Sequence, residues 1–464
     1  MVFSSNIFLF MFLPVTLLLY YNPVYRSRQF RNVLLLLASL FFYAWGEPFF
    51  VWLMIVSVVI GWQVGLKITG ANSQQGRKLW LFAGTAFHLG VLFVFKYLTF
   101  AAGQLGLLLQ QDFSAVQLAL PIGISFFTFQ LLSYLFDIYY EKAEAQHNVL
   151  HVGLYIALFP QLIAGPIVRY ADIEREILYR QETRQDFTAG MIRFSYGLAK
   201  KVLLANYLAV IAMNTRMMSA QEPLSVAAAW LGAAAYTLQI YFDFSGYSDM
   251  AIGLGQMFGF HFRENFNYPY ISRSVTEFWR RWHMSLSYWF RDYVYIPLGG
   301  SRCSRGRLAL NLFIVWSLTG FWHGANWTFL VWGLIFFFLL ILEKFTGFTD
   351  RLGIFGHLYT MLAVIMAWVV FEFPDFGQSL AYLGMMWGLA GNPLVDGMAV
   401  HFMTSGWLIW FLGLACSLPL YPWAEKNWQL WRPVVEPCLA AFLFLLSVIV
   451  TVAGNYNPFI YFNF

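Results

Sequence analysis

Charged residues are scarce in this chain. Only 11% of its 464 residues are Asp, Glu, Lys or Arg, whereas 60% are hydrophobic. A soluble domain usually carries about 25% charged residues, so this scarcity excludes an ordinary soluble protein. Apolar runs follow one another with short loops between them, among them IFLFMFLPVTLLLYY near the start and CLAAFLFLLSVIVTVAG near the end. Because a spanning helix needs about 20 apolar residues, we expect one integral membrane domain over residues 1–464, with roughly ten to twelve spans.

Cysteines and metal-binding motifs are also nearly missing. Cys303, Cys416 and Cys438 lie far apart without a CxxC pair, and the chain contains no HExxH or DxD pattern. The sequence therefore predicts neither a disulfide framework nor a metal site. An internal repeat is not visible either, which counts against a transporter built from inverted repeats.

Basic residues are missing before the first apolar run, while Arg26, Arg28 and Arg31 follow it. A signal peptide has the reverse order of charge, so we expect no cleavable leader. The positive-inside rule predicts these arginines in the cytoplasm and the N-terminus outside. Further basic loops follow the same pattern. The net charge of +5 then reflects topology, and we expect membrane lipids rather than nucleic acid as surroundings.

The least membrane-like stretch of the chain runs from Asn265 to Arg302. Ser274 and Glu277 form an S-x-x-E capping box, so a helix is expected to begin there. Apolar and aromatic side chains then recur every three or four residues, which predicts one continuous amphipathic helix. These positions are Phe278, Trp282, Leu286, Trp289, Phe290 and Tyr293. The charge indicates a helix at the cytoplasmic interface or one that enters a polar cavity. His283 lies within this predicted helix, with an interfacial histidine bonded to backbone as the alternative to a functional role.

A second histidine, His323, lies in the apolar stretch LTGFWHGANWTFLVWG. An imidazole in hydrocarbon costs free energy unless something hydrogen-bonds it, so at membrane depth it is a functional hypothesis by default. Helical spacing predicts Gly320 and Trp327 on its side and Gly324 next to its ring. Since glycine allows close approach, we expect a slot beside the imidazole. The alternative is a buried histidine that ties two helices together.

We expect the acidic residues in apolar runs to be paired with other protein groups in a structural role. Asp137, Asp243 and Asp249 lie beside tyrosines, serines and glycines at expected helix ends, where caps and basic loops can satisfy them. A proton relay is the alternative. The stretch FPQLIAGPIVRY, residues 159–170, holds two prolines and a glycine. It predicts a broken or re-entrant helix, which is permitted only where protein or a water-filled cavity covers it.

Three long segments of the chain resemble hallmark segments of bacterial membrane-bound O-acyltransferases. They are YFDFSGYSDMAIG, ENFNYPYISRSVTEFWRRWHMSLSYWFRDYVYIPLGG and GFWHGANWTFLVWG. The opening MVFSSNIFLFMFLP and the closing NPFIYFNF resemble the alginate O-acetyltransferase branch. The resemblance implies an all-α polytopic protein in which a ring of about eleven helices surrounds a thin centre with short or re-entrant helices. It also implies a central tunnel where a cytoplasmic donor and an outside acceptor meet.

The resemblance assigns catalytic roles to the two histidines. His323 matches the signature histidine of the family, and an imidazole, with an unperturbed pKa of about 6.5, suits a general base at neutral pH. His283 matches the second histidine of bacterial members and is expected to orient the donor or polarise its carbonyl. The expected donor is acetyl-coenzyme A or an acyl-carrier thioester, with no tightly bound cofactor.

Other residues are expected to surround this centre. Basic side chains on the central segment could hold donor phosphates, although they could equally be ordinary positive-inside residues; they are Arg280, Arg281 and Arg291. The expected tunnel lining comprises Trp282, Trp322, Asn326 and Trp327.

The aromatic tail, residues 459–464, holds one nucleophilic hydroxyl, that of Tyr461. It is predicted either to relay the acyl group or to anchor the terminus at the outer interface. No segment reads as a large extracellular sugar-binding domain. We therefore expect a periplasmic esterase-like (SGNH) partner with a catalytic serine, and a secreted polysaccharide such as alginate or cellulose as final acceptor.

The expected location is the bacterial inner membrane. Within the enzyme class, D-alanyl transfer or peptidoglycan O-acyl transfer on the same scaffold is the alternative. A polytopic transporter or channel is the alternative from another class.

Overall fold

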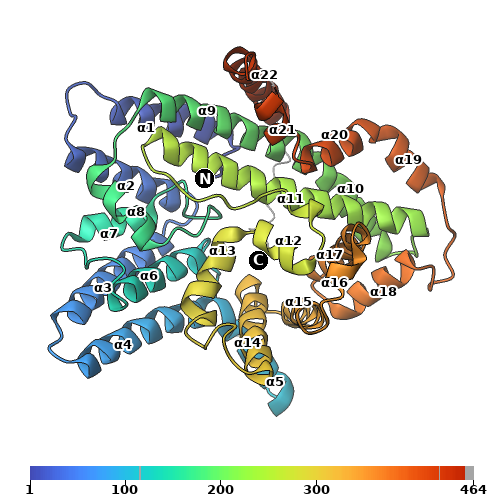
Figure 1. Ribbon diagram of the computed structural model, residues 1–464, viewed down its shortest axis with the longest axis horizontal. Coiled ribbons are helices and arrows are strands. Elements are labelled where there is room, and N and C mark those ends of the chain that lie inside the picture. The colour runs from blue at the N-terminus through green and yellow to red at the C-terminus, as the bar shows by residue number, and fades with distance from the viewer. Residues whose placement is uncertain (114–115, 428, 455–464) are drawn as a thin grey trace. The chain divides into compact units, whose positions relative to one another are not determined.

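Every regular element of the described chain is helical (Figure 1). The computed structural model describes residues 1–113, 116–427 and 429–454. The predicted all-α fold is thereby confirmed. Two compact units are distinguished along the chain: Met1–Phe194 with Ser248–Arg263, and Ser195–Tyr247 with the residues from Glu264 onward. The single integral domain predicted over residues 1–464 stays a prediction.

The first unit is built from the N-terminal helices. They are η1 (Phe8–Phe12), α1 (Leu13–Tyr20), α2 (Arg28–Ala44), α3 (Phe50–Gly70), α4 (Gln74–Leu92), η2 (Phe93–Tyr97), α5 (Leu98–Leu109), α6 (Ile124–Tyr139), α7 (Val149–Ala157) and α8 (Tyr170–Tyr179). Within this unit α3 packs against α4, α6 and α7, and α2 packs against α7. Two further helices contribute residues to both units, namely α9 (Arg184–Ala199) and α11 (Val226–Met257).

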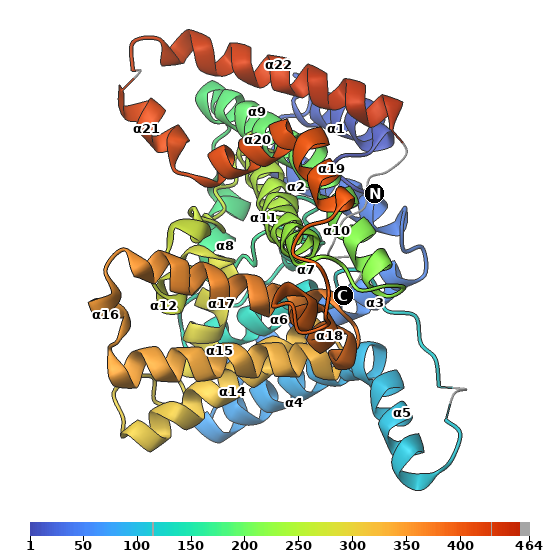
Figure 2. The same ribbon diagram turned by 90° about the vertical axis from the view of Figure 1, so that its right-hand side faces the viewer.

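The second unit holds the remaining helices. They are η3 (Lys200–Ala205), α10 (Asn206–Ser219), η4 (Pro269–Ile271), α12 (Val275–Arg281), α13 (Met284–Phe290), η5 (Arg291–Tyr295), α14 (Arg305–His323), α15 (Trp327–Thr346), α16 (Thr349–Leu352), α17 (Phe355–Glu372), α18 (Phe376–Met386), α19 (Gly397–Ser405), α20 (Trp407–Ser417), α21 (Leu420–Asn427) and α22 (Arg432–Ala453). Helices α14, α15 and α17 lie side by side (Figure 2), and α12 packs on α15 and α17.

Six helical segments of the described chain are long and apolar enough to cross a membrane, or seven if the bent pair α19 and α20 counts as one span. They are Phe50–Gly70, Gln74–Leu109, Arg184–Ser219, Trp327–Thr346, Phe355–Glu372 and Arg432–Ala453. The predicted number of about eleven is not confirmed by this count. Other apolar runs form shorter helices, such as Phe8–Tyr20 and Ile124–Tyr139.

The helical chain is broken over the proline-rich stretch of the first unit, where a broken or re-entrant helix was predicted. Helix α7 ends at Ala157, and residues 158–169 form turns and loop that are almost entirely buried. Side chains take over part of the backbone hydrogen bonding. The Phe159 N–H donates to Ser39 Oγ at 3.0 Å, and the Tyr155 hydroxyl donates to the Val168 carbonyl at 2.9 Å. Buried irregular backbone is stable here because its polar groups find such partners.

Two acidic residues lie in the middle of a helix rather than at a helix end, so that part of the prediction is wrong. Asp243 and Asp249 are both inside α11. The expectation of structural pairing is confirmed, because Asp243 forms an ion pair with Lys201 at 2.6 Å and Asp249 forms one with Arg193 at 2.9 Å. Opposite charge from a neighbouring helix replaces the expected cap. Asp137, near the end of α6, accepts a hydrogen bond from the Ala171 N–H at 3.0 Å.

Candidate active site

Helix α12 begins where the sequence predicts, and a buried acid holds its first turn. Ser274 Oγ accepts from the Glu277 N–H at 3.0 Å, while Glu277 pairs with Arg281 at 2.9 Å. Glu343 on α15 accepts from the N–H groups of Val275 and Thr276 at 2.6 and 2.9 Å. A carboxylate at this position satisfies amides that have no partner inside the helix. Helix α12 is thereby fixed to α15.

The continuous helix predicted beyond this point is wrong, because the chain breaks at His283. Helix α12 ends at Arg281, and α13 begins at Met284. His283 itself has φ 42° and ψ 53°, the left-handed conformation that non-glycine residues rarely adopt. Such a conformation costs about 1–3 kcal/mol, and residues of this kind cluster at active sites. The apolar periodicity runs through the break, which is why the pattern concealed it.

The His283 ring is buried among aromatic rings and polar side chains of the second unit. His283 is only 1% exposed. The Phe244 ring lies edge-on at a centroid distance of 4.6 Å, and Nδ1 lies 3.1 Å from Asn265 Oδ1. Within the described part of the chain, Nε2 is buried and has no hydrogen-bond partner. Burial lowers the pKa of this imidazole to about 3, so the ring is neutral with one nitrogen available to a ligand.

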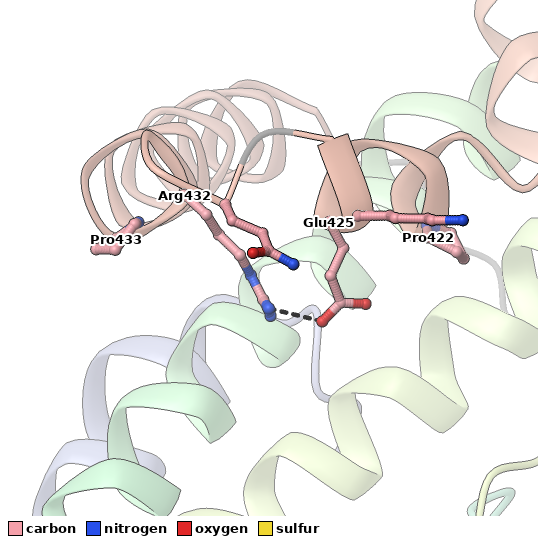
Figure 3. A pocket seen from close by; sticks show the side chains of 6 residues that line it. Pro422, Glu425, Arg432 and Pro433 are labelled. Carbon is pink, nitrogen blue, oxygen red and sulfur yellow. Dashed lines mark hydrogen bonds and ion pairs between the residues drawn. The ribbon is translucent and has the colours of Figure 1, made fainter.

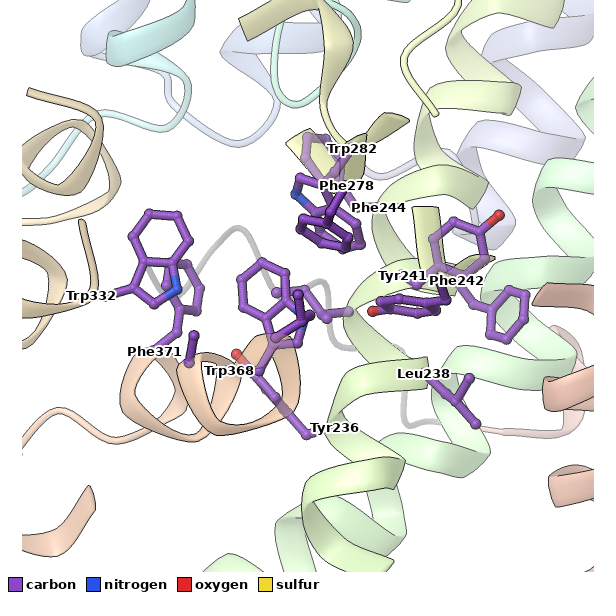
Figure 4. Close-up of a cluster of buried hydrophobic side chains, with 14 of the residues drawn as sticks. Tyr236, Leu238, Tyr241, Phe242, Phe244, Phe278, Trp282, Trp332, Trp368 and Phe371 are labelled. Atoms are coloured by element: carbon purple, nitrogen blue, oxygen red, sulfur yellow. The ribbon is translucent and has the colours of Figure 1, made fainter. Parts of the chain in front are cut away.

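His323 terminates α14 and lies among rings from α15 and α17. It is 8% exposed, and the rings of Trp332 and Phe371 stand edge-on to it at centroid distances of 5.0 and 5.1 Å. These two rings belong to the buried aromatic cluster drawn in Figure 4. The imidazole is thus held in a largely apolar surrounding, which excludes bulk water from it.

The slot expected beside His323 is filled, and the prediction built on the glycines is wrong. The helix ends at His323, so helical spacing does not place Trp327 on the same side. A Cβ added at Gly324 would lie 2.3 Å from the Phe329 ring, and one at Gly320 would lie 2.4 Å from the Phe329 carbonyl oxygen. Because Gly320 and Gly324 have no side chain, α15 can approach α14 closely, and Phe329 occupies the space beside them.

The structure brings the two histidines to the same indole. The centroid of the Trp322 ring lies 5.9 Å from that of His283 and 4.9 Å from that of His323. The rings come from residues forty positions apart in the sequence, yet both belong to the second unit. Two neutral or titratable nitrogens beside one buried aromatic surface form a candidate centre for proton transfer.

The residues expected to line a tunnel are in different surroundings. Trp282 and Trp322 are buried, and Trp282 packs on Trp368 at 4.9 Å (Figure 4). Asn326 instead caps α15 by accepting from the Thr328 N–H, and it donates to the Pro374 carbonyl. Trp327 is 50% exposed. Their role as tunnel lining stays a prediction.

The three candidate donor-binding arginines lie toward the surface. Arg280 and Arg291 are exposed, and Arg281 is partly so. Arg281 is engaged with Glu277, and Arg291 is paired with Asp292 at 2.7 Å. To bind the phosphates of a donor, Arg281 and Arg291 would have to release the carboxylates of Glu277 and Asp292. Tyr461 and the rest of the tail lie outside the described residues.

Two residues of the second unit, Asn265 beside His283 and the buried Lys201, were not predicted. Asn265 contacts His283 only through tertiary packing, and no local pattern indicates it. Lys201, whose side chain is buried against Asp243, is different, because GLAKKVLLANYLAV places lysines inside an apolar run. An ionisable residue in such a run usually has a buried partner, so this pair was open to prediction.

No group of three or more His, Cys, Asp or Glu suited to a metal ion occurs in the described ranges. A cavity of about 590 Å³ lies at the turn between α21 and α22 (Figure 3). Its wall includes Arg432 and Glu425, which form an ion pair at 2.6 Å. Neither histidine lines it, so it is separate from the candidate centre.

Comparison with known proteins links these features to one family. A model of the membrane-bound O-acyltransferase family matches residues 140–376. A probable alginate O-acetylase of Pseudomonas putida is 39% identical, and the match covers 100% of both chains. A probable alginate O-acetylase of Pseudomonas aeruginosa is 45% identical over 80% of this chain and 72% of its own. A peptidoglycan O-acetyltransferase of Helicobacter pylori is 32% identical over 100% of this chain and 98% of its own.

Proposed function

This chain belongs to the membrane-bound O-acyltransferase family, and we propose that it moves an acetyl group from a cytoplasmic thioester toward a secreted polysaccharide. It is an O-acyltransferase and a multi-pass membrane protein. The proposal adds the donor, the direction of transfer and the acceptor. We further propose the bacterial inner membrane as its location, with the N-terminus outside, as the distribution of basic residues favours.

Alginate is the polymer that the relatives support best. Two of these relatives, matched over 100% and 80% of this chain, carry the name probable alginate O-acetylase, and the one matched over 98% of its own length carries the name peptidoglycan O-acetyltransferase. The higher identity to the first two favours alginate over peptidoglycan. D-alanyl transfer and cellulose acetylation remain alternatives within the class, and gene neighbours that encode a polymerase would decide between the acceptors.

The observation that carries the proposal is the pair of buried imidazoles that both lie next to the Trp322 ring. A thioester is hydrolysed if water reaches it during transfer, so the reaction centre has to be dry. His283 and His323 are two residues in this aromatic surrounding whose imidazoles can accept a proton. Positioning donor and acceptor together there could contribute about 7–11 kcal/mol, and a general base adds roughly 10²–10⁴-fold.

The proposed reaction is balanced by one proton that passes through His323. The imidazole takes the proton of an acceptor hydroxyl while the hydroxyl oxygen attacks the thioester carbonyl carbon. The new C–O bond forms, the C–S bond breaks, and the proton passes from the imidazole to the sulfur. The products are an ester and a free thiol, and His323 returns to its neutral form.

Two further steps are proposed for the periphery. Arg280, Arg281 and Arg291 bind the phosphates of coenzyme A or of a carrier's phosphopantetheine. Tyr461 receives the acetyl group outside and an SGNH-type periplasmic partner completes transfer to the polymer. A phenol ester retains transfer potential because phenoxide, with a pKa of about 10, leaves more easily than an alkoxide.

Replacing either histidine tests the proposal. We expect His323→Ala to abolish acetylation of the secreted polymer by intact cells, while the protein still inserts and purifies. His283→Ala should impair it as well, with a loss of about 10²-fold or more if general catalysis is removed. The matched control is His401→Ala, because His401 is exposed on α19. Normal acetyl content with His323→Ala would remove this residue from the mechanism.

A second assay separates the enzyme from a transporter. Purified protein given labelled acetyl-coenzyme A and a hydroxyl acceptor should release free coenzyme A. Absence of thiol release with this donor and with acyl-carrier thioesters would favour transport.

A further inference from the structure

The backbone N–H of Ser285 identifies which side-chain atom of Asn265 is the amide oxygen. Oδ1 lies 3.2 Å from the backbone N–H of Ser285 and 2.8 Å from the Ser285 hydroxyl. A backbone N–H can only donate, so the atom that faces it is the oxygen and not the amide nitrogen. The orientation of the Asn265 side chain follows from this contact, independently of the histidine.

The same oxygen then determines which nitrogen of His283 carries the proton. Nδ1 lies 3.1 Å from Asn265 Oδ1. An amide oxygen accepts and does not donate, so Nδ1 must be the N–H partner. The Ser285 hydroxyl lies 3.4 Å from Nδ1. If this hydroxyl donated to Nδ1, the lone pair of Nδ1 would face a lone pair of Asn265 Oδ1, which is unfavourable. In the neutral ring, Nε2 therefore has a lone pair and no hydrogen.

Backbone hydrogen bonds keep this arrangement in place. The Met284 N–H donates to the Asn265 carbonyl, and the Asn267 N–H donates to the Arg281 carbonyl, both at 2.9 Å. These two bonds bracket His283 and stabilise its left-handed conformation. Asn265 thus holds the residue through its main chain and the ring through its side chain.

We propose that Asn265 is a positioning residue that keeps His283 in the Nδ1–H form, so that Nε2 accepts a hydrogen bond from an O–H or N–H group of a substrate. This inference rests on the proposed acyl transfer. It decides between the two roles expected for His283. A neutral ring in this form has no hydrogen on Nε2 and cannot polarise a thioester carbonyl, whereas it can orient an acceptor hydroxyl or a donor amide.

The charge around His283 makes the pH dependence a usable test. Among the described residues Nε2 has no hydrogen-bond partner, and the ring stands at the N-terminus of α13, which disfavours a positive charge. The titratable groups on the surrounding elements are Asp243, ion-paired with Lys201, then Glu264, Arg281 and, beyond Trp322, His323. A carboxylate placed at position 265 would stabilise the imidazolium and raise the pKa of His283.

Two substitutions at this position separate positioning from packing. Asn265→Asp retains an oxygen acceptor, so it should lose activity at low pH and recover most of it at high pH as the ring becomes neutral. Asn265→Ala removes the acceptor and should lower kcat by about 10- to 100-fold at every pH. The matched control is Asn311→Ala, because Asn311 is also buried but bonds only the 300–303 turn among its described contacts. That variant should keep the wild-type pH profile.

The pH profile of activity is measured as thiol release from acetyl-coenzyme A. A second donor, a simple thioester that has no amide, shows which substrate group donates the hydrogen bond to Nε2. If the donor amide binds Nε2, the effect of Asn265→Ala on that simple thioester disappears; if the acceptor hydroxyl binds, it persists. An unshifted pH profile for Asn265→Asp, with Asn265→Ala and Asn311→Ala equally active, would overturn the positioning role while leaving acyl transfer intact.

A measurement without turnover tests the same inference if wild-type protein releases no thiol. Nitrogen NMR of ¹⁵N-histidine-labelled protein should show one neutral ring in the Nδ1–H form that is lost in His283→Gln. Asn265→Ala should redistribute that signal toward the Nε2–H form. A His283 ring in the Nε2–H form in the wild type would refute the inference.

Discussion

A single indole, that of Trp322, contacts both imidazoles of the candidate centre. Its ring lies between aromatic neighbours rather than against solvent, and it is buried. We expect Trp322→Phe to retain partial activity, because a smaller ring still excludes water, and Trp322→Ala to lose most of it. Removing a buried Trp costs about 3–5 kcal/mol. Acetyl content of the polymer, compared with the amount of folded protein in the membrane, separates loss of catalysis from loss of protein.

The hydroxyl of Tyr461 separates a relay from an anchor. Tyr461→Phe removes one oxygen and puts at risk a hydrogen bond worth about 0.5–1.5 kcal/mol. We expect it to stop acetylation of the polymer without affecting insertion or thiol release to a small soluble acceptor. Mass spectrometry of wild-type protein supplied with donor alone should find acetyl on Tyr461. Full polymer acetylation by Tyr461→Phe would leave the tail as an aromatic anchor.

The histidines illustrate what residue patterns alone can predict. Their presence in apolar and aromatic stretches identified both of them, because a titratable ring in such a stretch is unusual. Their common contact with Trp322 and the hydrogen bond that His283 donates to Asn265 could not be predicted. Both depend on segments that are distant in sequence, and periodicity describes only one element at a time.

Helices α14 and α15 form a hairpin whose spacing is set by glycine. A Cβ at Gly320 would lie 2.4 Å from the Phe329 carbonyl oxygen, while one at Gly306, on the same helix, meets nothing within 4 Å. We expect Gly320→Ala to separate the two helices and to displace His323. The free energy of unfolding should fall by roughly 1–3 kcal/mol. Gly306→Ala should change neither stability nor activity. Melting of the two purified variants in detergent, together with thiol release, gives the comparison.

The same hairpin shows where element prediction failed. The glycines around His323 were interpreted as space for a ligand, but Phe329 occupies that space. Likewise, a regular apolar repeat predicted one helix through His283, although the chain turns there with a positive φ. Start signals such as Ser274 are local and were read correctly, whereas a break inside a repeat is imposed by tertiary contacts.

The first unit contains an ionic cluster centred on Glu182. Glu182 accepts from Arg28 at 2.5 Å and from Arg31 at 2.8 Å, and the Tyr20 hydroxyl donates to it at 2.5 Å. Burial alone would raise the pKa of Glu182, but the hydrogen bonds from Arg28 and Tyr20 outweigh it and lower that pKa.

Because the folded pKa of Glu182 is depressed, its contribution is present above the unfolded value, about 4.3, and disappears as pH falls through the folded value. We expect the melting temperature of the wild type to fall on acidification in this range. Glu182→Gln should be less stable at neutral pH, by about 3–5 kcal/mol for a buried charge left without its partner, and its melting temperature should depend less on acid. Equal acid sensitivity of the two proteins would exclude this cluster as the cause.

Composition was sufficient to identify the chain as a membrane protein, and long motifs were sufficient to indicate its family. The number of spans was harder to predict, because hydrophobic runs do not reveal which helices are short, bent or broken. The ion pairs that Asp243 and Asp249 of α11 form with Lys201 and Arg193 also explain how acidic residues can occupy apolar segments without serving in transport.

Transfer across the bilayer is the central claim, and sealed vesicles test it most directly. Purified protein is reconstituted with labelled acetyl-coenzyme A on the cytoplasmic side and a hydroxyl acceptor, with any required periplasmic partner, trapped on the other. We predict label on the trapped acceptor and free coenzyme A on the donor side with the wild type, and neither with His323→Ala. Label that stays on the donor side, or intact acetyl-coenzyme A that appears with the acceptor, would contradict the account.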